Sequence, residues 1–198
     1  MPSLALLYSG GKDSSLAALL LDPFYDVTLR PATFGVTDDY RYACDAAAAL
    51  GFDVDPLELD RSVAETAVEE MASDGYPRNG IQRVHDHALE TVAEGEFDAV
   101  ADGTRRDDRA PTVPRSRAQS LEDRHFVDYV APLAGFGRHA IDALADAELA
   151  VESGPSEDVG RADYEAELRA LLADRRDESA VRAVFPDHVQ SRVTGRAE

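Results

Sequence analysis

Several residue types are scarce in this chain. Its 198 residues include no tryptophan, one cysteine (Cys44) and one lysine (Lys12), against nineteen arginines. A single cysteine excludes an internal disulfide bond and any metal cluster held by several cysteines of one chain. We expect Cys44 in the core, because free cysteine is among the most buried residue types. No apolar run is long enough to span a membrane, and Met1 precedes strand-like residues rather than a signal sequence, so we expect a cytoplasmic protein.

Basic residues are also scarce relative to acidic ones. Twenty lysine and arginine residues face 39 aspartate and glutamate residues, which gives a formal net charge of −19. Such a composition indicates a densely acidic surface, as in proteins that stay soluble in a salt-rich cytoplasm. Concentrated salt screens charge, so the acidity does not exclude contact with nucleic acid. The length suits one well-filled core.

The most informative stretch is "YSGGKDSS" at residues 8–15, directly after the apolar run "LALL". Glycines between a strand and a helix let backbone N–H groups face an anion at the helix N-terminus. The common nucleotide loop G-x-x-x-x-G-K-[ST] does not match, because Leu6 replaces its first glycine and Asp13 replaces its hydroxyl residue. A dinucleotide G-x-G-x-x-G loop lacks its third glycine here. The segment therefore predicts a phosphate loop of another type.

The side chains of this loop suit a magnesium-bound phosphate. Ser9 and Ser14 offer hydroxyl groups to phosphate oxygens, Lys12 offers a compact positive charge, and Asp13 can hold magnesium. The retention of the chain's one lysine inside this turn favours a specific need for an ammonium group. The alternative is an ordinary strand-to-helix turn in which Asp13 or Ser14 caps the helix.

Strand-like and helix-like segments alternate along the chain. Alternation of this kind predicts right-handed crossovers and a doubly wound α/β domain, with five parallel strands and helices on both faces. The expected strands are residues 3–8, 26–35, 53–59, 97–104 and 126–133. The expected helices are residues 13–22, 38–50, 62–74, 79–94, 138–149 and 163–176. We expect a nucleotide-binding domain over 1–150, with a C-terminal helix and tail over 151–198 packed on it.

A second loop, "GTRRDDR" at residues 103–109, follows the fourth expected strand. If this strand lies beside the first, both loops face one crevice at the carboxyl edge of the sheet. Asp107 and Asp108 can then supply a carboxylate to magnesium or orient an attacking group; the alternative is a helix cap or a solvated turn. Residues 105–117 carry five arginines, which predicts contact with pyrophosphate, an acidic substrate or RNA, or else surface ion pairs.

These two loops resemble those of the PP-loop ATP pyrophosphatases, the superfamily of adenine nucleotide alpha hydrolases. The first is similar to their SGGxDS loop, and the second to the G-x-x-x-D-D loop of the tRNA-lysidine synthetase and tRNA thiolation branch. The resemblance implies attack by a substrate on the α-phosphate of ATP, giving an adenylated product and pyrophosphate. It implies these nucleotide-binding residues: Ser9, Gly10, Gly11, Lys12, Asp13, Ser14, Ser15, Thr33, Phe34, Gly35, Gly103 and Thr104. It implies Lys12, Asp13, Asp107 and Asp108 as catalytic residues, with magnesium on Asp13 and Asp107.

The resemblance does not extend to a subtype. Thiolation enzymes generally carry cysteines before the fourth strand, whereas Ile81 and Val84 occupy the corresponding stretch here. Cys44 alone could not hold an iron–sulfur cluster, so classical sulfur transfer is disfavoured. The added domains of the larger synthetases are also missing, which indicates a minimal, stand-alone archaeal member.

Other features carry weaker predictions. His85 and His87 point to different faces of a helix, so we interpret them as structural or solvent-facing rather than as a metal pair. Arg138 follows a glycine-containing turn and can reach the crevice or lie on the surface. The 163–176 helix fits packing on the sheet or on a second subunit, as in a homodimer. The tail from Phe185 to Arg192 has the composition of an ordered segment that docks near the site or on a partner.

Two functions of different class remain open from the sequence. The first is an ATP-dependent enzyme that adenylates tRNA or a small molecule and releases pyrophosphate. The second is a sensor or partner protein that binds ATP or AMP on the same fold without turnover. The second acidic loop favours the enzyme, because a protein that only holds a nucleotide has less need of it.

Overall fold

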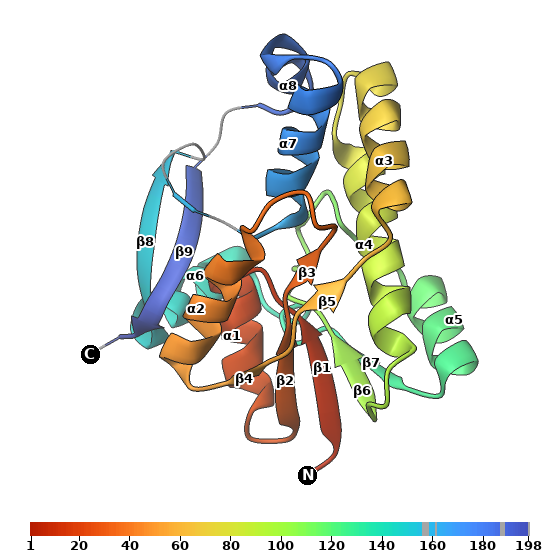
Figure 1. Cartoon of the computed structure of the whole chain (residues 1–198). Coiled ribbons are helices and arrows are strands. Elements are labelled where there is room, and N and C mark those ends of the chain that lie inside the picture. The colour runs from red at the N-terminus through yellow and green to blue at the C-terminus, as the bar shows by residue number, and fades with distance from the viewer. Residues whose placement is uncertain (156–158, 161, 187–188, 198) are drawn as a thin grey trace.

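The computed structural model describes residues 1–155, 159–160, 162–186 and 189–197. Its centre is a five-stranded parallel sheet with the order β4-β2-β1-β6-β7 (Figure 1). The strands are β1 (Ser3–Leu7), β2 (Asp26–Arg30), β4 (Asp53–Val54), β6 (Ala99–Ala101) and β7 (Asp128–Val130). The strand order reverses between β1 and β6, which confirms the predicted doubly wound fold and places the fourth predicted strand beside the first.

The alternating side chains of β1 divide the core into two halves. Leu4 and Leu6 belong to one buried cluster, and Ala5 and Leu7 to the other. The first cluster is covered by α1 (Lys12–Leu21), α2 (Tyr40–Leu50) and α6 (Arg138–Glu148). The second is covered by α3 (Arg61–Asp74), α4 (Arg78–Ala93), α5 (Arg115–His125) and α7 (Tyr164–Arg175). Among the described helices, none is both long and apolar enough to cross a membrane.

Two predicted strands are each broken at a proline. The expected strand 26–35 ends as β2 at Arg30, and a short β3 (Ala32–Thr33) follows Pro31. Likewise, Pro56 separates β4 from β5 (Leu57–Glu58). Proline has no N–H to donate to a ladder, and β3 and β5 pair with each other in a small parallel sheet of their own. The expectation of two continuous strands was therefore wrong at these positions.

The sequence reading missed several elements. Helix α5 buries only Leu121, so it has no apolar periodicity to reveal it. Strand β8 (Leu149–Pro155) and strand β9 (Val189–Arg196) form an antiparallel pair beside α2 and α6 (Figure 1). The short helix α8 (Glu178–Val184) was also not predicted. The order expected in the tail is confirmed for residues 185–186 and 189–192, since β9 contacts the first loop through the N–H of Val193. Residues 187–188 lie outside the described residues.

The C-terminal helices pack into the same core as the sheet. Leu168, Leu171 and Leu172 of α7 are buried in the cluster that contains Ala5 and Leu7. Phe185, after α8, is 1% exposed in the same cluster. Packing within one chain thus accounts for the apolar face of α7.

Candidate functional site

The 8–15 segment leaves β1 and enters α1 at the carboxyl edge of the sheet, as predicted. Gly10 has a φ of +74°, and a Cβ on it would lie 3.0 Å from the Cα of Ala43, so this position requires glycine for two reasons. The backbone N–H of Ser9 donates to the Oγ of Ser14 at 3.3 Å, and their hydroxyl oxygens are 3.2 Å apart. Behind the loop, the N–H of Val193 in β9 donates to the carbonyl of Gly10 at 3.0 Å. The loop is therefore held in shape by contacts within the chain.

Helix α1 begins directly after the glycines of this loop. Gly11 is its N-cap, and within the described residues no side chain caps it. The first intrahelical bond runs from the N–H of Ser15 to the carbonyl of Gly11 at 3.0 Å, so the preceding amides have no acceptor inside the helix. The alternative in which Asp13 or Ser14 is the N-cap is not what the structure shows. Free amides and the helix dipole make this turn suitable for an anion.

Lys12 lies beside two carboxylates. Its Nζ is 2.8 Å from Asp13 Oδ1 and 2.9 Å from Asp142 Oδ1 on α6. Burial lowers the pKa of Lys12, but the hydrogen bonds and charges of Asp13 and Asp142 outweigh burial and raise the pKa overall. Lys12 therefore stays charged. No local pattern pointed to Asp142, because 130 residues separate it from Lys12.

The second loop lies directly on the first turn of α1. A Cβ on Gly103 would be 2.8 Å from the Cα of Ser14, so only glycine allows this approach. Asp108 accepts hydrogen bonds from the backbone N–H of Arg105 at 2.7 Å and from its guanidinium at 2.8 Å. Arg105 also lies 3.4 Å from Asp13. The predicted meeting of the two loops is thus observed, with Arg105 linking their carboxylates.

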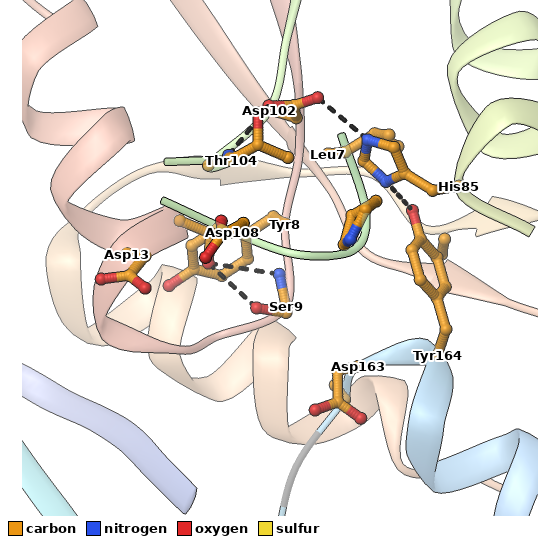
Figure 2. Close-up of a pocket in the computed structure, with 15 residues that line it drawn as sticks. Leu7, Tyr8, Ser9, Asp13, His85, Asp102, Thr104, Asp108, Asp163 and Tyr164 are labelled. Carbon is orange, nitrogen blue, oxygen red and sulfur yellow. Dashed lines mark hydrogen bonds and ion pairs between the residues drawn. The ribbon is translucent and has the colours of Figure 1, made fainter. Parts of the chain in front are cut away.

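The two loops border a cavity of about 230 Å³ (Figure 2). Six of the predicted site residues line it: Ser9, Asp13, Ser14, Gly103, Thr104 and Asp108. Gly10, Gly11 and Lys12 lie beside it in the loop. Ser15 turns inward, where its hydroxyl is 2.8 Å from that of Tyr8. Asp107 does not line the cavity, and its side chain is 43% exposed.

The opposite end of the cavity holds a buried polar network that the sequence reading did not identify. His85 Nε2 is 3.0 Å from Asp102 Oδ2, and the other ring nitrogen is 3.4 Å from the hydroxyl of Tyr164 (Figure 2). Tyr129 donates its hydroxyl to the same Asp102 oxygen at 3.0 Å. Of the two alternatives predicted for His85, structural or solvent-facing, its burial agrees with the first, and it also lines the cavity. A signal was present in Asp102, an acidic residue at the carboxyl end of a buried strand and directly before Gly103.

Thr33, Phe34 and Gly35 lie outside this cavity. The buried carboxylate of Glu167, on α7, accepts hydrogen bonds from the N–H groups of Phe34 at 2.7 Å and Val36 at 2.9 Å. It also accepts from the hydroxyl of Thr33 at 3.0 Å. The backbone that the family resemblance assigned to adenine is therefore bound to α7, and its role in binding adenine stays a prediction.

The arginine-rich segment 105–117 divides between inward and outward side chains. The guanidinium of Arg105 lies beside Asp13 of the first loop, and that of Arg117 lies 2.8 Å from the carboxylate of Glu90. Arg106, Arg109 and Arg115 are exposed. The ion-pair alternative therefore describes Arg105 and Arg117, and the other three arginines are accessible to a ligand.

The structure also tests the predictions made for Cys44 and Arg138. Cys44 is half-buried on α2 rather than part of the core, so that expectation was wrong. Arg138 is exposed at the start of α6, with its Nε 3.9 Å from Asp142. It therefore lies near Lys12 but on the surface.

Magnesium was predicted on Asp13 and Asp107. In the described part of the chain, no group of three or more histidine, cysteine or acidic side chains could hold a metal ion. Asp13 lines the cavity, whereas Asp107 does not. The Oδ1 of Asp107 lies 3.8 Å from the Nε of Arg105. Magnesium is bound by one or two carboxylates together with substrate phosphates, so one protein carboxylate suits this ion when a nucleotide supplies the rest.

Comparison with known proteins gives a family for this chain. The family of unknown function DUF7411 matches residues 2–195. The uncharacterized protein MJ0690 of Methanocaldococcus jannaschii is 41% identical over 191 residues, which cover 96% of this chain and 94% of the relative. A crystal structure of a predicted subunit of tRNA methyltransferase from Methanocaldococcus jannaschii has a TM-score of 0.91 and 39% identity, covering 100% of this chain and 99% of its own.

A more distant likeness is to the U34-tRNA thiolase NcsA of Methanococcus maripaludis, solved with its 4Fe-4S cluster. The TM-score is 0.47 and the identity 20%, over 73% of this chain and 56% of the thiolase. At that level neither the activity nor the cluster carries over. The match over nearly the whole sequence is decisive instead: this chain belongs to the family of unknown function DUF7411.

Proposed function

We propose that this protein binds ATP with magnesium at the carboxyl edge of the sheet and cleaves it between the α and β phosphates. One observation carries the proposal. The first turn of α1 and the Gly103 loop are in backbone contact and border one cavity, with Lys12 and Arg105 beside it. Uncapped amides, a glycine turn and two cations are the features that bind a pyrophosphate group.

The residues of the first loop suit the leaving group of this reaction. Negative charge grows on the β-phosphate as its bond to the α-phosphate breaks. Fixed amides at the start of α1 and the Lys12 ammonium would stabilise this charge more than they stabilise bound ATP. Asp13, which lines the cavity, would hold magnesium together with the phosphates of ATP, and the ion would screen the phosphate charges.

For the acceptor we favour tRNA over a small molecule. The similar solved structure is described as a predicted subunit of tRNA methyltransferase. Arg106, Arg109 and Arg115 are exposed next to the cavity loop, where they can contact phosphates of an RNA backbone. A small acceptor would have less need of cations outside the cavity.

A second candidate function is a subunit that binds ATP without cleaving it. Asp108, one of the predicted catalytic residues, has its carboxylate engaged by the backbone and guanidinium of Arg105. Such a carboxylate can shape the loop without touching a substrate. The same structural relative, described as a predicted subunit, agrees with this function.

Product analysis separates the two. The protein is incubated with magnesium and ATP labelled at the α-phosphate, with and without total tRNA, and the products are separated by chromatography. The enzyme predicts AMP or an adenylated RNA together with pyrophosphate. Both should be lost in Lys12→Ala but not in Arg61→Ala, which removes an exposed charge on α3 that does not line the cavity. Binding of ATP with no product supports the subunit, and release of ADP contradicts the proposed cleavage.

A further inference from the structure

A line of hydrogen bonds leads from the cavity into the interior at the end opposite the phosphate loop. Tyr164 lines the cavity from α7, and its hydroxyl points to His85 on α4 (Figure 2). His85 is 3% exposed and contacts Asp102, which is 1% exposed, at the end of β6. The nucleotide loops lie at one end of the cavity and this line of groups at the other.

The hydrogen-bond partners of Asp102 determine which groups of the network donate protons and which accept them. One carboxylate oxygen accepts from the backbone N–H of Thr104 at 2.9 Å and from its hydroxyl at 2.6 Å. The other accepts from Tyr129 and lies 3.0 Å from His85 Nε2. Burial raises the pKa of Asp102, but the hydrogen bonds and charge of His85, with those from Thr104, outweigh burial and lower it.

An ionised carboxylate can only accept, so His85 must carry its proton on Nε2. When the imidazole is neutral, its Nδ1 carries no proton and can accept the hydroxyl proton of Tyr164, at 3.4 Å. Burial raises the pKa of Tyr164. The phenol therefore stays protonated and can transfer a proton only by receiving another one.

We propose that Tyr164 is a catalytic residue that accepts the proton of the attacking group, while His85 and Asp102 are positioning residues behind it. The proposal rests on the proposed cleavage of ATP. The attacking oxygen forms a bond to the α-phosphorus, its proton passes to Tyr164 Oη, and the phenol proton passes to His85 Nδ1. The bond between the α-phosphorus and the bridging oxygen breaks, and pyrophosphate leaves with that electron pair. Asp102 stabilises the imidazolium that forms.

A role in stability alone does not explain this arrangement. A buried histidine and carboxylate cost desolvation free energy, and apolar residues of similar size often replace such pairs without loss of stability. Here the end of the network opens into the cavity instead of ending in the core. Thr104 also joins Asp102 to the loop that borders the proposed nucleotide site. The network therefore connects the two ends of the cavity.

Other ionisable groups also face this network. Tyr129 contacts Asp102. The other groups line the cavity together with His85: Tyr164, Tyr8, Asp13, Asp108 and Asp163. A variant of His85 is therefore needed to assign any pH dependence.

The test uses magnesium ATP as the probe, with water and then total tRNA as the acceptor. Binding is measured by calorimetry, and AMP release by chromatography from about pH 5 to about pH 9, the range around histidine titration. Tyr164→Phe keeps the ring beside His85 and removes the hydroxyl. We expect AMP release to fall about 100-fold while ATP affinity is kept, because removing a general base costs 10²–10⁴-fold. Tyr129→Phe removes a hydroxyl that donates to Asp102 from outside the cavity, and it should lower AMP release by less than about tenfold.

The pH profile distinguishes a relay from a structural contact. For the wild type, AMP release should fall in acid as the imidazole becomes protonated and can no longer accept. In His85→Asn this acid limb should disappear together with most of the rate. Equal rates in Tyr164→Phe and wild type, or an unchanged acid limb in His85→Asn, contradict the relay.

The remaining outcomes are also decisive. If the wild type binds magnesium ATP but releases neither AMP nor pyrophosphate at any pH, with or without total tRNA, the relay is wrong and nucleotide binding stands. If Tyr164→Phe loses ATP affinity as much as rate, Tyr164 belongs to the binding site and the relay is wrong. If the wild type does not bind magnesium ATP, the proposed function fails, and the relay fails with it.

Discussion

Gly103 shows how one missing side chain assembles the site. A Cβ at this position would lie 2.8 Å from the Cα and 2.9 Å from the backbone nitrogen of Ser14. Backbone atoms cannot move aside as a flexible side chain can. The contact therefore fixes the distance between the two loops.

Gly103→Ala should lower the free energy of unfolding by about 1–3 kcal/mol, because overpacking forces a backbone shift. It should also weaken ATP binding by separating the loops. The matched control is Gly135→Ala, where an added Cβ meets no atom within 4 Å. Urea unfolding measures the free energy of unfolding of the two variants. Equal stability of both would contradict the close backbone contact at Gly103.

Asp102 should give stability a specific pH dependence. Its folded-state pKa is lowered, so it stabilises the fold at neutral pH, and this contribution is lost as the pH falls through the folded-state pKa. Asp102→Asn should therefore be less stable than the wild type near pH 7, and the difference should shrink below about pH 4. Urea unfolding at a series of pH values measures it. A difference that stays constant with pH would mean that the ionised form is not stabilised.

At the scale of elements, α7 is fastened to the 33–37 segment through one side chain. Glu167 is buried and accepts from Thr33, Phe34, Val36 and Thr37. A carboxylate has enough lone pairs to accept from all of these donors. A glutamine amide in its place would face them with two N–H groups, which are donors themselves.

Glu167→Gln should therefore lower the free energy of unfolding by about 1–3 kcal/mol, the cost of unsatisfied buried groups. It should also expose the 33–37 segment to limited proteolysis. Asp174→Asn, an exposed change on the same helix, is the control and should have no effect on either. Resistance of Glu167→Gln to both assays would show that α7 is held by its leucines alone.

How far the sequence could predict these elements depended on the range of the interactions. The 8–15 loop was predictable because its glycines, serines and lysine act within one turn. The parallel sheet followed from apolar runs such as Leu4 to Leu7. Helix α5 and strand β9 were missed, because α5 buries one side chain and β9 forms only against β8.

The polar network could not be predicted from local pattern. His85 lies 17 residues from Asp102 and 79 from Tyr164, so only the fold brings them together. A histidine on a helix is by itself ambiguous. Its role depended on the side chains opposite it in three dimensions.

At the scale of the whole molecule, the net charge of −19 opposes the compact state at low ionic strength. We predict that the thermal midpoint rises as potassium chloride is increased from about 0.1 M, where the Debye length is about 10 Å, to above 1 M, where it is about 3 Å. Circular dichroism melting at each concentration measures this. A midpoint independent of salt would show that the acidic surface does not limit stability.

The central claim is that the 8–15 loop binds the phosphates of ATP. Calorimetric titration of ATP into the wild type, Lys12→Ala and Arg61→Ala, with and without magnesium and in concentrated salt, tests it most directly. We expect magnesium-dependent binding to the wild type and Arg61→Ala. Affinity should be at least about tenfold lower in Lys12→Ala, since a charge-assisted contact to phosphate is lost. No binding by the wild type, or equal binding by Lys12→Ala, would contradict it.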